Sequence, residues 1–292
     1  MRVLIFGVNG MLGHKLYQRL GSRFDVYGTI RKDFDAVAKF GIFEKDRIIG
    51  NIDGFSSESL RRAIDEVKPD FVINAIGVIK QIPTSKDVIH ALTLNSILPQ
   101  RLAEFANEDG FRLITISTDC VFDGVKGNYS EAETPDARDL YGLSKLLGEI
   151  NSPNALTIRT SIIGRELETG HSIVEWFLGN RGGRVKGYTR AIYTGFPTIV
   201  MAGIIADIIA ERPELHGVWH VSSDPITKFD LLTMLNKQFD TGVEIEPSDE
   251  VVIDRSLNST NFRELTGFMP ISWEGLVDMI ATDPTPYGSW KK

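Results

Sequence analysis

A glycine-rich turn near the amino terminus is the feature that most constrains the fold of this 292-residue chain. The motif Gly7-x-x-Gly10-x-x-Gly13 follows an apolar run, Val3–Phe6, and leads into an amphipathic segment, Met11–Leu20. In such a strand–turn–helix unit the first glycine allows the tight turn, the second lets the backbone approach a pyrophosphate, and the third allows close helix–strand packing. The free N–H groups at the start of the helix can bind phosphate. The turn therefore predicts a dinucleotide site, although glycines needed only for chain geometry would give the same pattern.

Short β-branched runs alternate with longer amphipathic segments through the first half of the chain. This alternation is typical of a parallel sheet with crossover helices. Strands are expected at Val3–Phe6, Val26–Ile30, Arg47–Ile49, Asp70–Ala75, Arg112–Ser117 and Leu156–Thr160. Helices are expected at Met11–Leu20, from Ser56 or Ser57 to Val67, at Asp87–Ala106 with a bend near Pro99, and at Leu140–Ile150. The predicted fold class is α/β, a Rossmann-type doubly wound parallel sheet with a smaller carboxyl-terminal lobe.

The alternation loosens after about Gly164. Short extended pieces such as Val218–Val221 separate the later helical signals. These signals lie at Ser172–Leu178, Ile199–Ala210, Thr227–Phe239 and Trp273–Ala281. We expect residues 1–164 to form the nucleotide-binding domain and residues 165–292 to form a substrate-binding lobe that is interleaved with it.

The charge of the chain limits its partners. Its net charge is −7 and no block of Lys and Arg stands out, so nucleic acid is not expected as a partner. The single cysteine, Cys120, excludes an internal disulfide framework and suits a reducing cytoplasm. The early apolar run is too short for a signal peptide, and the apolar stretch Ile199–Ala210 is too short to span a bilayer. A cytoplasmic protein without a membrane partner is expected, and a homodimer is compatible with the sequence.

The end of the second predicted strand distinguishes the two nicotinamide cofactors. A carboxylate there binds the ribose 2′-hydroxyl, whereas an arginine accommodates a 2′-phosphate. Arg31 and Lys32 follow this strand and favour NADP(H) over NAD(H), although Asp33 and Asp35 lie close behind. Asp53, after the third strand, either reaches the adenine amino group or serves as a loop or cap residue. Further cofactor contacts are predicted from Asn9, Met11 and Leu12 in the glycine turn and from Ala75 and Gly77 after the fourth strand.

A tyrosine and a lysine four residues apart, Tyr141 and Lys145, lie on one face of a predicted helix. A tyrosine hydroxyl has a pKa of about 10, too high for efficient proton transfer at neutral pH. A neighbouring ammonium stabilises the phenolate and lowers this pKa, and it can also bind the nicotinamide ribose. Thr118, at the end of a strand, can donate a hydrogen bond to a carbonyl that becomes an alkoxide. The three residues predict hydride transfer to a carbonyl, and a surface Tyr–Lys pair beside a strand-end threonine is the alternative.

Three segments together resemble the extended short-chain dehydrogenases/reductases, and within them the dTDP-4-dehydrorhamnose reductase group. They are the glycine turn, Ser117–Gly124 (Ser-Thr-Asp-Cys-Val-Phe-Asp-Gly) and Tyr141–Glu149 (Tyr-Gly-Leu-Ser-Lys-Leu-Leu-Gly-Glu). The similarity is clear over about residues 1–165 and diffuse beyond them. The resemblance implies NADPH-dependent reduction of a 4-keto group on a nucleotide-linked 6-deoxy sugar, in surface polysaccharide synthesis. In that reaction Tyr141 would be the proton donor and Thr118 would polarise the ketone.

Two neighbouring residues refine this expectation. Asp119 either assists or orients the sugar or holds the loop before Gly124. Cys120 stands where the rhamnose-pathway enzymes usually have tyrosine, and where related dehydratases have the glutamate that abstracts a proton. Dehydration is therefore not expected. Cys120 and the segment Val78-Ile79-Lys80-Gln81 leave the identity of the keto-sugar open.

Residues that contact the substrate are less clearly marked. Lys80 follows the end of a strand, where α/β proteins bind ligands, and Cys120 would lie beside the sugar. Asn95 resembles the asparagine that supports the catalytic lysine through water in short-chain reductases, or it is an ordinary polar helix residue. Trp176 and Tyr188 either line the sugar or base or belong to the core. Candidates for binding the diphosphate, each of which could instead be a surface residue, are Arg184, Lys186, Arg190 and Arg255. The histidines show no metal-ligand spacing, so no metal is predicted.

Two other functions fit the same motifs. A nucleotide-sugar epimerase uses the same tyrosine and lysine but returns its hydride, so it consumes no NADPH. The beta subunit of methionine adenosyltransferase resembles this reductase group and binds NADP while it serves a partner enzyme. Intact Thr118, Tyr141 and Lys145 argue against such a non-catalytic regulatory role.

Overall fold

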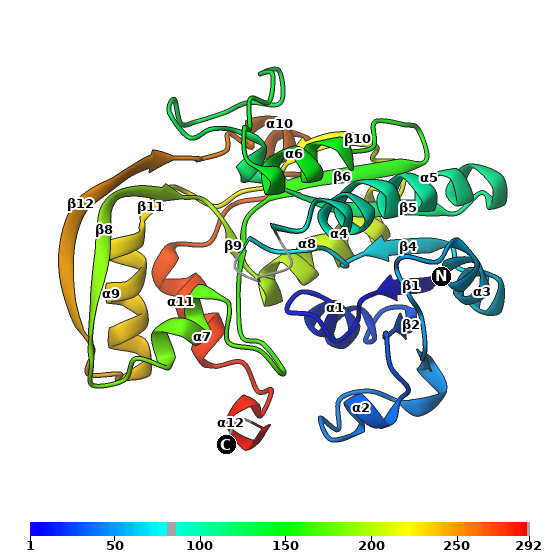
Figure 1. Ribbon diagram of the computed structural model, residues 1–292, viewed down its shortest axis with the longest axis horizontal. Helices are drawn as coiled ribbons and strands as arrows, with labels where there is room; N and C mark the ends of the chain where they lie inside the picture. Colours follow the sequence, from blue (N-terminus) through cyan, green and yellow to red (C-terminus); the bar gives the residue numbers. More distant parts are fainter. Residues whose placement is uncertain (81–85, 291–292) are drawn as a thin grey trace.

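A seven-stranded parallel sheet forms the centre of the computed structural model, which describes residues 1–80 and 86–290 (Figure 1). Gln81 lies outside the described residues. The strands are ordered β10-β6-β5-β4-β1-β2-β3, and every neighbouring pair is parallel. They are β1 (Arg2–Phe6), β2 (Asp25–Thr29), β3 (Ile48–Ile49), β4 (Phe71–Asn74), β5 (Arg112–Thr118), β6 (Ala155–Thr160) and β10 (Gly217–His220). The direction of winding reverses between β1 and β4, as in doubly wound nucleotide-binding sheets. The predicted Rossmann-type α/β class is confirmed.

Helices cover both faces of this sheet (Figure 1). The longer ones are α1 (Gly13–Leu20), α3 (Ser57–Val67), α5 (Leu98–Asp109), α6 (Leu140–Leu147), α8 (Thr198–Glu211), α9 (Lys228–Phe239), α10 (Thr260–Thr266) and α11 (Trp273–Ala281). The shorter ones are α2 (Asp35–Ala38), α4 (Val88–Leu92), α7 (Ile173–Leu178) and α12 (Tyr287–Trp290). The described residues also include short turns of other helix types, η1 (Lys45–Arg47), η3 (Thr93–Ile97) and η4 (Asp119–Val121).

Alternate residues of β1 enter two separate hydrophobic cores. Val3 and Ile5 belong to the core that contains α1 and α8, whereas Leu4 and Phe6 belong to the core that contains α3 and α5. All four side chains are fully buried. Because successive side chains of a strand point to opposite faces, a strand covered on both sides has no position for a polar residue.

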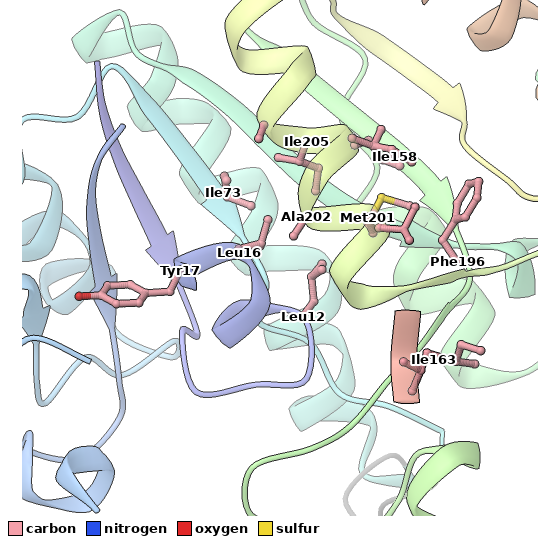
Figure 2. Packing of buried hydrophobic residues seen from close by; sticks show 14 of the residues in the cluster. Leu12, Leu16, Tyr17, Ile73, Ile158, Ile163, Phe196, Met201, Ala202 and Ile205 are labelled. Carbon is pink, nitrogen blue, oxygen red and sulfur yellow. The ribbon is translucent and has the colours of Figure 1, made fainter. Parts of the chain in front are cut away.

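The packing of α1 against α8 joins the two halves of the chain. Figure 2 shows Leu12 and Leu16, at the start and middle of α1, beside Ala202 and Ile205 of α8. The strand β10 likewise comes from the second half of the chain and extends the sheet beside β6. Elements on both sides of residue 164 therefore build the same sheet and the same core.

A second sheet of three strands, which the sequence analysis does not anticipate, lies beside the first. Its central strand β8 (Arg184–Tyr193) pairs in parallel with β12 (Glu244–Asp254) and antiparallel with β11 (Ile226–Thr227). The helix α9 packs on β8. Acidic residues and Pro247 dominate β12, a composition disfavoured in strands, so pairing with β8 overrides local preference. A smaller two-stranded sheet joins β7 (Ile162–Ile163) to β9 (Phe196–Pro197).

The long helix expected over Asp87–Ala106 is present, but it is not α-helical throughout. The chain forms α4, then a π-helical turn at Thr93–Ile97, and then α5. Pro99 lies in the first turn of α5, directly after the π-helical turn. The interruption falls one turn earlier and contains Asn95. Such π turns often occur at functional sites.

A buried polar contact fastens residues 283–287 to α1. The Lys15 ammonium lies 2.6 Å from a carboxylate oxygen of Asp283 and donates a 2.6 Å hydrogen bond to Thr285 Oγ1. His14 Nε2 lies 2.7 Å from the Tyr287 hydroxyl. The Lys15 and Asp283 side chains are 3% and 5% exposed, so the ion pair is shielded from water. The helix that follows the glycine turn is therefore held by residues that lie about 270 positions later in the sequence.

Candidate active site

The glycine turn after β1 leaves its backbone uncovered by side chains. Gly7 has a φ of 82°, which favours glycine, and its carbonyl accepts a 3.1 Å hydrogen bond from the Gly10 N–H. A Cβ on Gly13 would lie 2.1 Å from the Gly7 oxygen and 2.9 Å from Val8 Cα. The turn therefore requires glycine at position 13. These residues fit a dinucleotide pyrophosphate, which needs close access to backbone N–H groups.

His14 supports this turn and was missed by the sequence analysis as part of the site. Its ring Nδ1 lies 2.8 Å from the Gly10 carbonyl oxygen, and its other nitrogen contacts Tyr287. The side chain is fully buried. The sequence signal for this support is a histidine directly after the third glycine.

The residues expected at the adenosine end lie together after β2 and β3. Arg31 and Lys32 are exposed, and the Lys32 carbonyl accepts a 2.9 Å hydrogen bond from the Asn51 N–H. Asp53 is also exposed, and its carboxylate accepts the N–H of Phe55 at 3.0 Å. The two basic side chains are therefore accessible to a ribose phosphate, while Asp53 already has a local partner in its own turn.

The end of β5 and the start of α6 bring the predicted catalytic residues together. Thr118 is the last residue of β5, and the Tyr141 hydroxyl lies within hydrogen-bonding reach of it. Thr118 Oγ1 donates to Asp119 Oδ1 at 3.1 Å and accepts the Cys120 N–H at 3.1 Å. Asp139 caps α6 by accepting the Gly142 N–H at 3.0 Å. With this cap α6 begins at Leu140, so Tyr141 lies in its first turn and Lys145 lies one turn further along the helix.

Lys145 lies on the same side of α6 and reaches back to the sheet. Its ammonium donates a short hydrogen bond of 2.5 Å to the Ile116 carbonyl oxygen, two residues before Thr118. A Cβ on Gly77 would lie 3.8 Å from the lysine nitrogen and 3.2 Å from Asn95 Oδ1. The segment after β4 therefore approaches Lys145 closely, and a glycine keeps that space open.

Asn95 links the segment after β4 to the catalytic helix. Its side-chain oxygen accepts the Val78 N–H at 2.8 Å, and its nitrogen donates to the Val78 carbonyl and to Ser144 Oγ. Ser144 precedes Lys145 on α6. Support of the lysine through water stays a prediction, whereas the direct contacts assign Asn95 to holding the loop and the helix together.

Burial dominates the electrostatics of the site. It raises the pKa of Tyr141, an effect reinforced by the negative charges of Asp119 and Asp139 and opposed by the hydrogen bond with Thr118. Burial lowers the pKa of Lys145 to about 8, against the opposing field of the Glu149 carboxylate. These pKa values describe the protein without a bound dinucleotide or substrate, whose charges would add to both.

Two further acidic groups are also shifted by burial. The pKa of the Asp119 carboxyl is raised, and the Asp119 side chain is almost fully enclosed. Burial raises the pKa of the Cys120 thiol to about 12, so this thiol is neutral at physiological pH. A neutral thiol cannot take the place of the proton-abstracting glutamate of a dehydratase.

A surface cavity of about 520 Å³ opens beside the start of α6. It is lined by Asp123, Val125, Ala137, Arg138, Asp139 and Arg255. Arg255 follows β12 and donates a 2.8 Å hydrogen bond to the Phe122 carbonyl, and its positive charge acts on the pKa of Asp119. Lys80 lies 2.9 Å from Asp139. Two of the predicted basic residues, Lys80 and Arg255, are thus brought to the catalytic end of α6, and Arg138 joins them unpredicted.

Tyr193 and Lys228 approach the site from the second sheet and its helix. Burial raises the pKa of Tyr193, an effect reinforced by the negative charge of Asp119, while the positive charge of Lys228 opposes the rise in the pKa of Asp119. Neither residue was predicted, because β8 and α9 reach the site only through tertiary packing. The carboxyl end of β8 and the start of α9 therefore come close to Asp119.

The remaining candidates lie along β8 or α7. Arg184 and Lys186 are exposed and form ion pairs with Glu244 and Glu250. Arg184 begins the strand that Tyr193 ends, and a strand extends by about 3.3 Å per residue. The structure therefore does not bring Arg184 and Lys186 to the catalytic residues. Arg190 is exposed on the same strand, Tyr188 is half-buried there, and Trp176 on α7 is 43% exposed.

The order of the strands, the glycine turn after β1 and the tyrosine–lysine helix beside the end of β5 define a short-chain dehydrogenase/reductase. Within this class the chain belongs to the RmlD substrate binding domain family, whose match covers residues 1–278. The resemblance drawn from three short segments is confirmed, and it extends well beyond residue 165. No helix in residues 1–80 or 86–290 has both the length and the apolar character needed to cross a bilayer.

Individual relatives have different roles. The dTDP-4-dehydrorhamnose reductase of Aggregatibacter actinomycetemcomitans is 27% identical over 281 residues, which cover 90% of this chain and 87% of the relative. Methionine adenosyltransferase 2 subunit beta of Danio rerio is 27% identical over 252 residues, which cover 82% and 74%. A solved dTDP-4-dehydrorhamnose reductase from Bacillus anthracis str. Ames, in complex with NADP, has a TM-score of 0.78 at 23% identity and covers 96% of this chain and 98% of that one. This structural likeness shows the shared fold.

The tight packing at Gly13 predicts that a single methyl group will weaken cofactor binding. In Gly13→Ala the added Cβ must displace the Gly7 carbonyl, so we expect NADPH affinity to fall more than about tenfold, a loss of about 1.4 kcal/mol. NADPH fluorescence titration measures this change. Gly170→Ala is the matched control, because a Cβ there has no neighbour within 4 Å. Equal affinity of the Gly13→Ala variant and the control would contradict the prediction that the pyrophosphate binds at this turn.

Proposed function

We propose that this protein is an NADPH-dependent reductase of a nucleotide-linked 4-keto-6-deoxy sugar. The observation that carries the proposal is the joint placement of Thr118, Tyr141 and Lys145 at the carboxyl edge of the sheet, the edge at which the glycine turn after β1 also lies. Kinship with dTDP-4-dehydrorhamnose reductases supports the choice of substrate class.

Each of the three residues has a separate task in carbonyl reduction. The hydroxyls of Thr118 and Tyr141 lie together, so both can bind one carbonyl oxygen. NADPH, when bound, supplies the hydride. Tyr141 gives its proton to the oxygen as negative charge develops there, and the Lys145 ammonium stabilises the resulting phenolate. The bond from Lys145 to the Ile116 carbonyl keeps the ammonium on the sheet side of α6.

The neighbours of Thr118 favour reduction over dehydration. The Cys120 thiol stays protonated at neutral pH, and burial also raises the pKa of Asp119. The protonated Cys120 thiol is therefore not suited to remove a carbon-bound proton from the sugar. Without substrate, Asp119 accepts a hydrogen bond from the Thr118 hydroxyl, and that hydroxyl would turn from Asp119 to donate to the carbonyl oxygen when the substrate binds.

The basic groups near the start of α6 support a phosphorylated substrate. Arg138 and Arg255 line the 520 Å³ cavity and Lys80 lies beside it, so a diphosphate could be neutralised there. We propose that the second sheet, with α9 and the segment that contains Arg255, is the substrate-binding lobe, and that residues 1–164 supply most of the cofactor site. Arg184 and Lys186 are not part of this proposal.

Loss of the Tyr141 hydroxyl is expected to abolish catalysis without loss of cofactor binding. In Tyr141→Phe we expect turnover to fall at least about 100-fold, because a positioned general acid contributes about 10²–10⁴-fold. The measurement is NADPH oxidation with 4-keto-6-deoxy sugars linked to dTDP, UDP, GDP and CDP. NADPH affinity should stay close to that of the unmodified protein. Turnover of the variant at the unmodified rate would remove Tyr141 from the reaction.

The same panel separates the two rival functions. An epimerase would interconvert nucleotide sugars without net oxidation of NADPH. A regulatory role is favoured by one observation, the 27% identity to the methionine adenosyltransferase subunit over 82% of this chain. That role predicts tight NADPH binding, no turnover on any member of the panel, and a stable complex with a partner enzyme.

We further propose that NADP(H), rather than NAD(H), is the cofactor, and that Arg31 and Lys32 bind its 2′-phosphate. Removing both positive groups in Arg31→Ser/Lys32→Ser should raise the KM for NADPH by about tenfold or more, since a hydrogen bond to a charged group contributes about 1.5–3 kcal/mol. The KM for NADH should change little. Steady-state kinetics with both cofactors tests this selectivity, and an equal effect on both would contradict it.

We also propose that the chain forms a homodimer through α4, η3 and α6. These three elements pack against one another, and they expose large apolar side chains. The exposed residues are Val88, Ile89, Ile97, Leu143 and Leu147. Leu147→Lys, which places a charge on the apolar face, should convert the dimer into a monomer by light scattering coupled to size-exclusion chromatography. Leu265→Lys on α10 is the control, and a monomeric unmodified protein would refute the proposal.

A further inference from the structure

Three polar residues form one buried row across neighbouring strands of the large sheet. Ser117 of β5 is paired in register with Arg159 of β6, which is paired in turn with His220 of β10. Residues in register on parallel strands point to the same face. All three are at most 5% exposed. The carbonyl reduction described above does not use Arg159 or His220, so their burial needs another explanation.

Glu149, just beyond the end of α6, completes this row. Its Oε1 accepts hydrogen bonds from Ser117 Oγ at 2.6 Å and from Arg159 Nε at 2.8 Å, and its Oε2 accepts one from Arg159 Nη2 at 2.7 Å. Both charged side chains are 7% exposed. The ion pair is therefore bidentate and enclosed, the geometry in which an arginine holds a carboxylate most firmly.

Arg159 also has contacts on the side that faces away from Glu149. Its Nη1 lies 3.3 Å from His220 Nε2, and His220 Nδ1 lies 3.0 Å from the Tyr129 carbonyl oxygen. A neutral imidazole with its proton on Nδ1 satisfies both contacts, in agreement with the lowering of the His220 pKa by burial. The Phe122 ring lies 5.4 Å from the guanidinium carbon and closes the remaining side.

Three consecutive residues of β5 hold three residues of the catalytic segment. The Ile116 carbonyl accepts from Lys145, and the Ser117 hydroxyl donates to Glu149. Thr118 lies within hydrogen-bonding reach of Tyr141. A shift of α6 along the strand would break all three contacts at once. The buried row therefore fixes the position of Tyr141 and Lys145 relative to Thr118.

We propose that the buried Glu149–Arg159 pair is a positioning device for Tyr141 and Lys145, which anchors the end of α6 on β5 and supplies the carboxylate that balances the Lys145 ammonium. This proposal rests on the proposed function only for the catalytic roles of Tyr141 and Lys145. Stability alone does not account for the pair, because apolar residues of similar volume often stabilise a core as well as a buried ion pair does.

Substituting either member of the pair should shift the pKa of Lys145, and the two substitutions should shift it in opposite directions. In Glu149→Gln the Arg159 charge is left without its partner, so the Lys145 ammonium is disfavoured and its pKa falls. In Arg159→Met the Glu149 carboxylate is left alone, so the pKa of Lys145 rises. The other charged or titratable groups around the site are unchanged in both variants. They are Tyr141 and Asp139 on or at the start of α6, Asp119 and Cys120 on η4, Lys80 after β4, Tyr193 on β8, Lys228 on α9, Glu131 and His220 near Arg159, and Arg255 after β12.

The test uses the full chain without cofactor or substrate. Acetic anhydride reacts with a neutral amine, so the pH dependence of Lys145 acetylation, read by peptide mass spectrometry, gives its pKa directly. We expect the midpoint to fall by at least about half a pH unit in Glu149→Gln and to rise by a similar amount in Arg159→Met. Ser117→Ala, which removes one hydrogen bond and no charge, should move it less than either variant.

Opposite shifts in the two charge variants support the proposal, whereas no shift or shifts of the same sign overturn it. If Arg159→Met does not fold, as judged by circular dichroism, the near-isosteric Glu149→Gln carries the test against Ser117→Ala. In the active enzyme, the alkaline limb of the kcat profile should move with the Lys145 midpoint. Because acetylation needs no turnover, an absence of reductase activity would count against the proposed function and leave this result independent.

Discussion

The contact between β5 and the α6 segment is the interaction on which the site depends. A strand end fixes Thr118, a helix fixes Tyr141 and Lys145, and catalysis requires the relative position of the two elements to be set within a fraction of an ångström. The chain meets this requirement with polar bonds from successive strand residues, because apolar packing alone tolerates sliding. The cost is the burial of charge, which Glu149 and Arg159 neutralise in each other.

The same contact explains why the site can be both enclosed and reactive. Burial raises the pKa of Tyr141 and lowers that of Lys145, so each group on its own is pushed toward its neutral form. When a carbonyl and a dinucleotide are bound, the Lys145 ammonium can stabilise the negative charge that develops on the Tyr141 oxygen. In the proposed reaction, the contacts of Lys145 and Glu149 with β5 serve proton transfer.

Local pattern predicted the features whose residues are close in the sequence. The glycine turn, the strands of the first half and the tyrosine–lysine helix could be predicted because each is specified by spacing within a few residues. The strands β8 and β12 could not, since an acidic segment with Pro247 becomes a strand only beside its partner. The approach of Arg255, Tyr193 and Lys228 to Asp119 depends on that second sheet, so sequence spacing gave no signal for it. His14 and Asn95 were visible as residues, but their bonds to backbone carbonyls and amides were not.

The fastening of α1 by Lys15 and Asp283 has a consequence for the order in which the protein is made. The strands β1 to β6 emerge from the ribosome first, and domains commonly begin to fold as they emerge. Until residues 283–287 have been synthesised, however, the contacts of Lys15 with Asp283 and Thr285 and of His14 with Tyr287 cannot form. The face of α8 that packs on α1 also arrives late. The nucleotide-binding half of the molecule can therefore be nearly complete in sequence long before its first helix is locked in place.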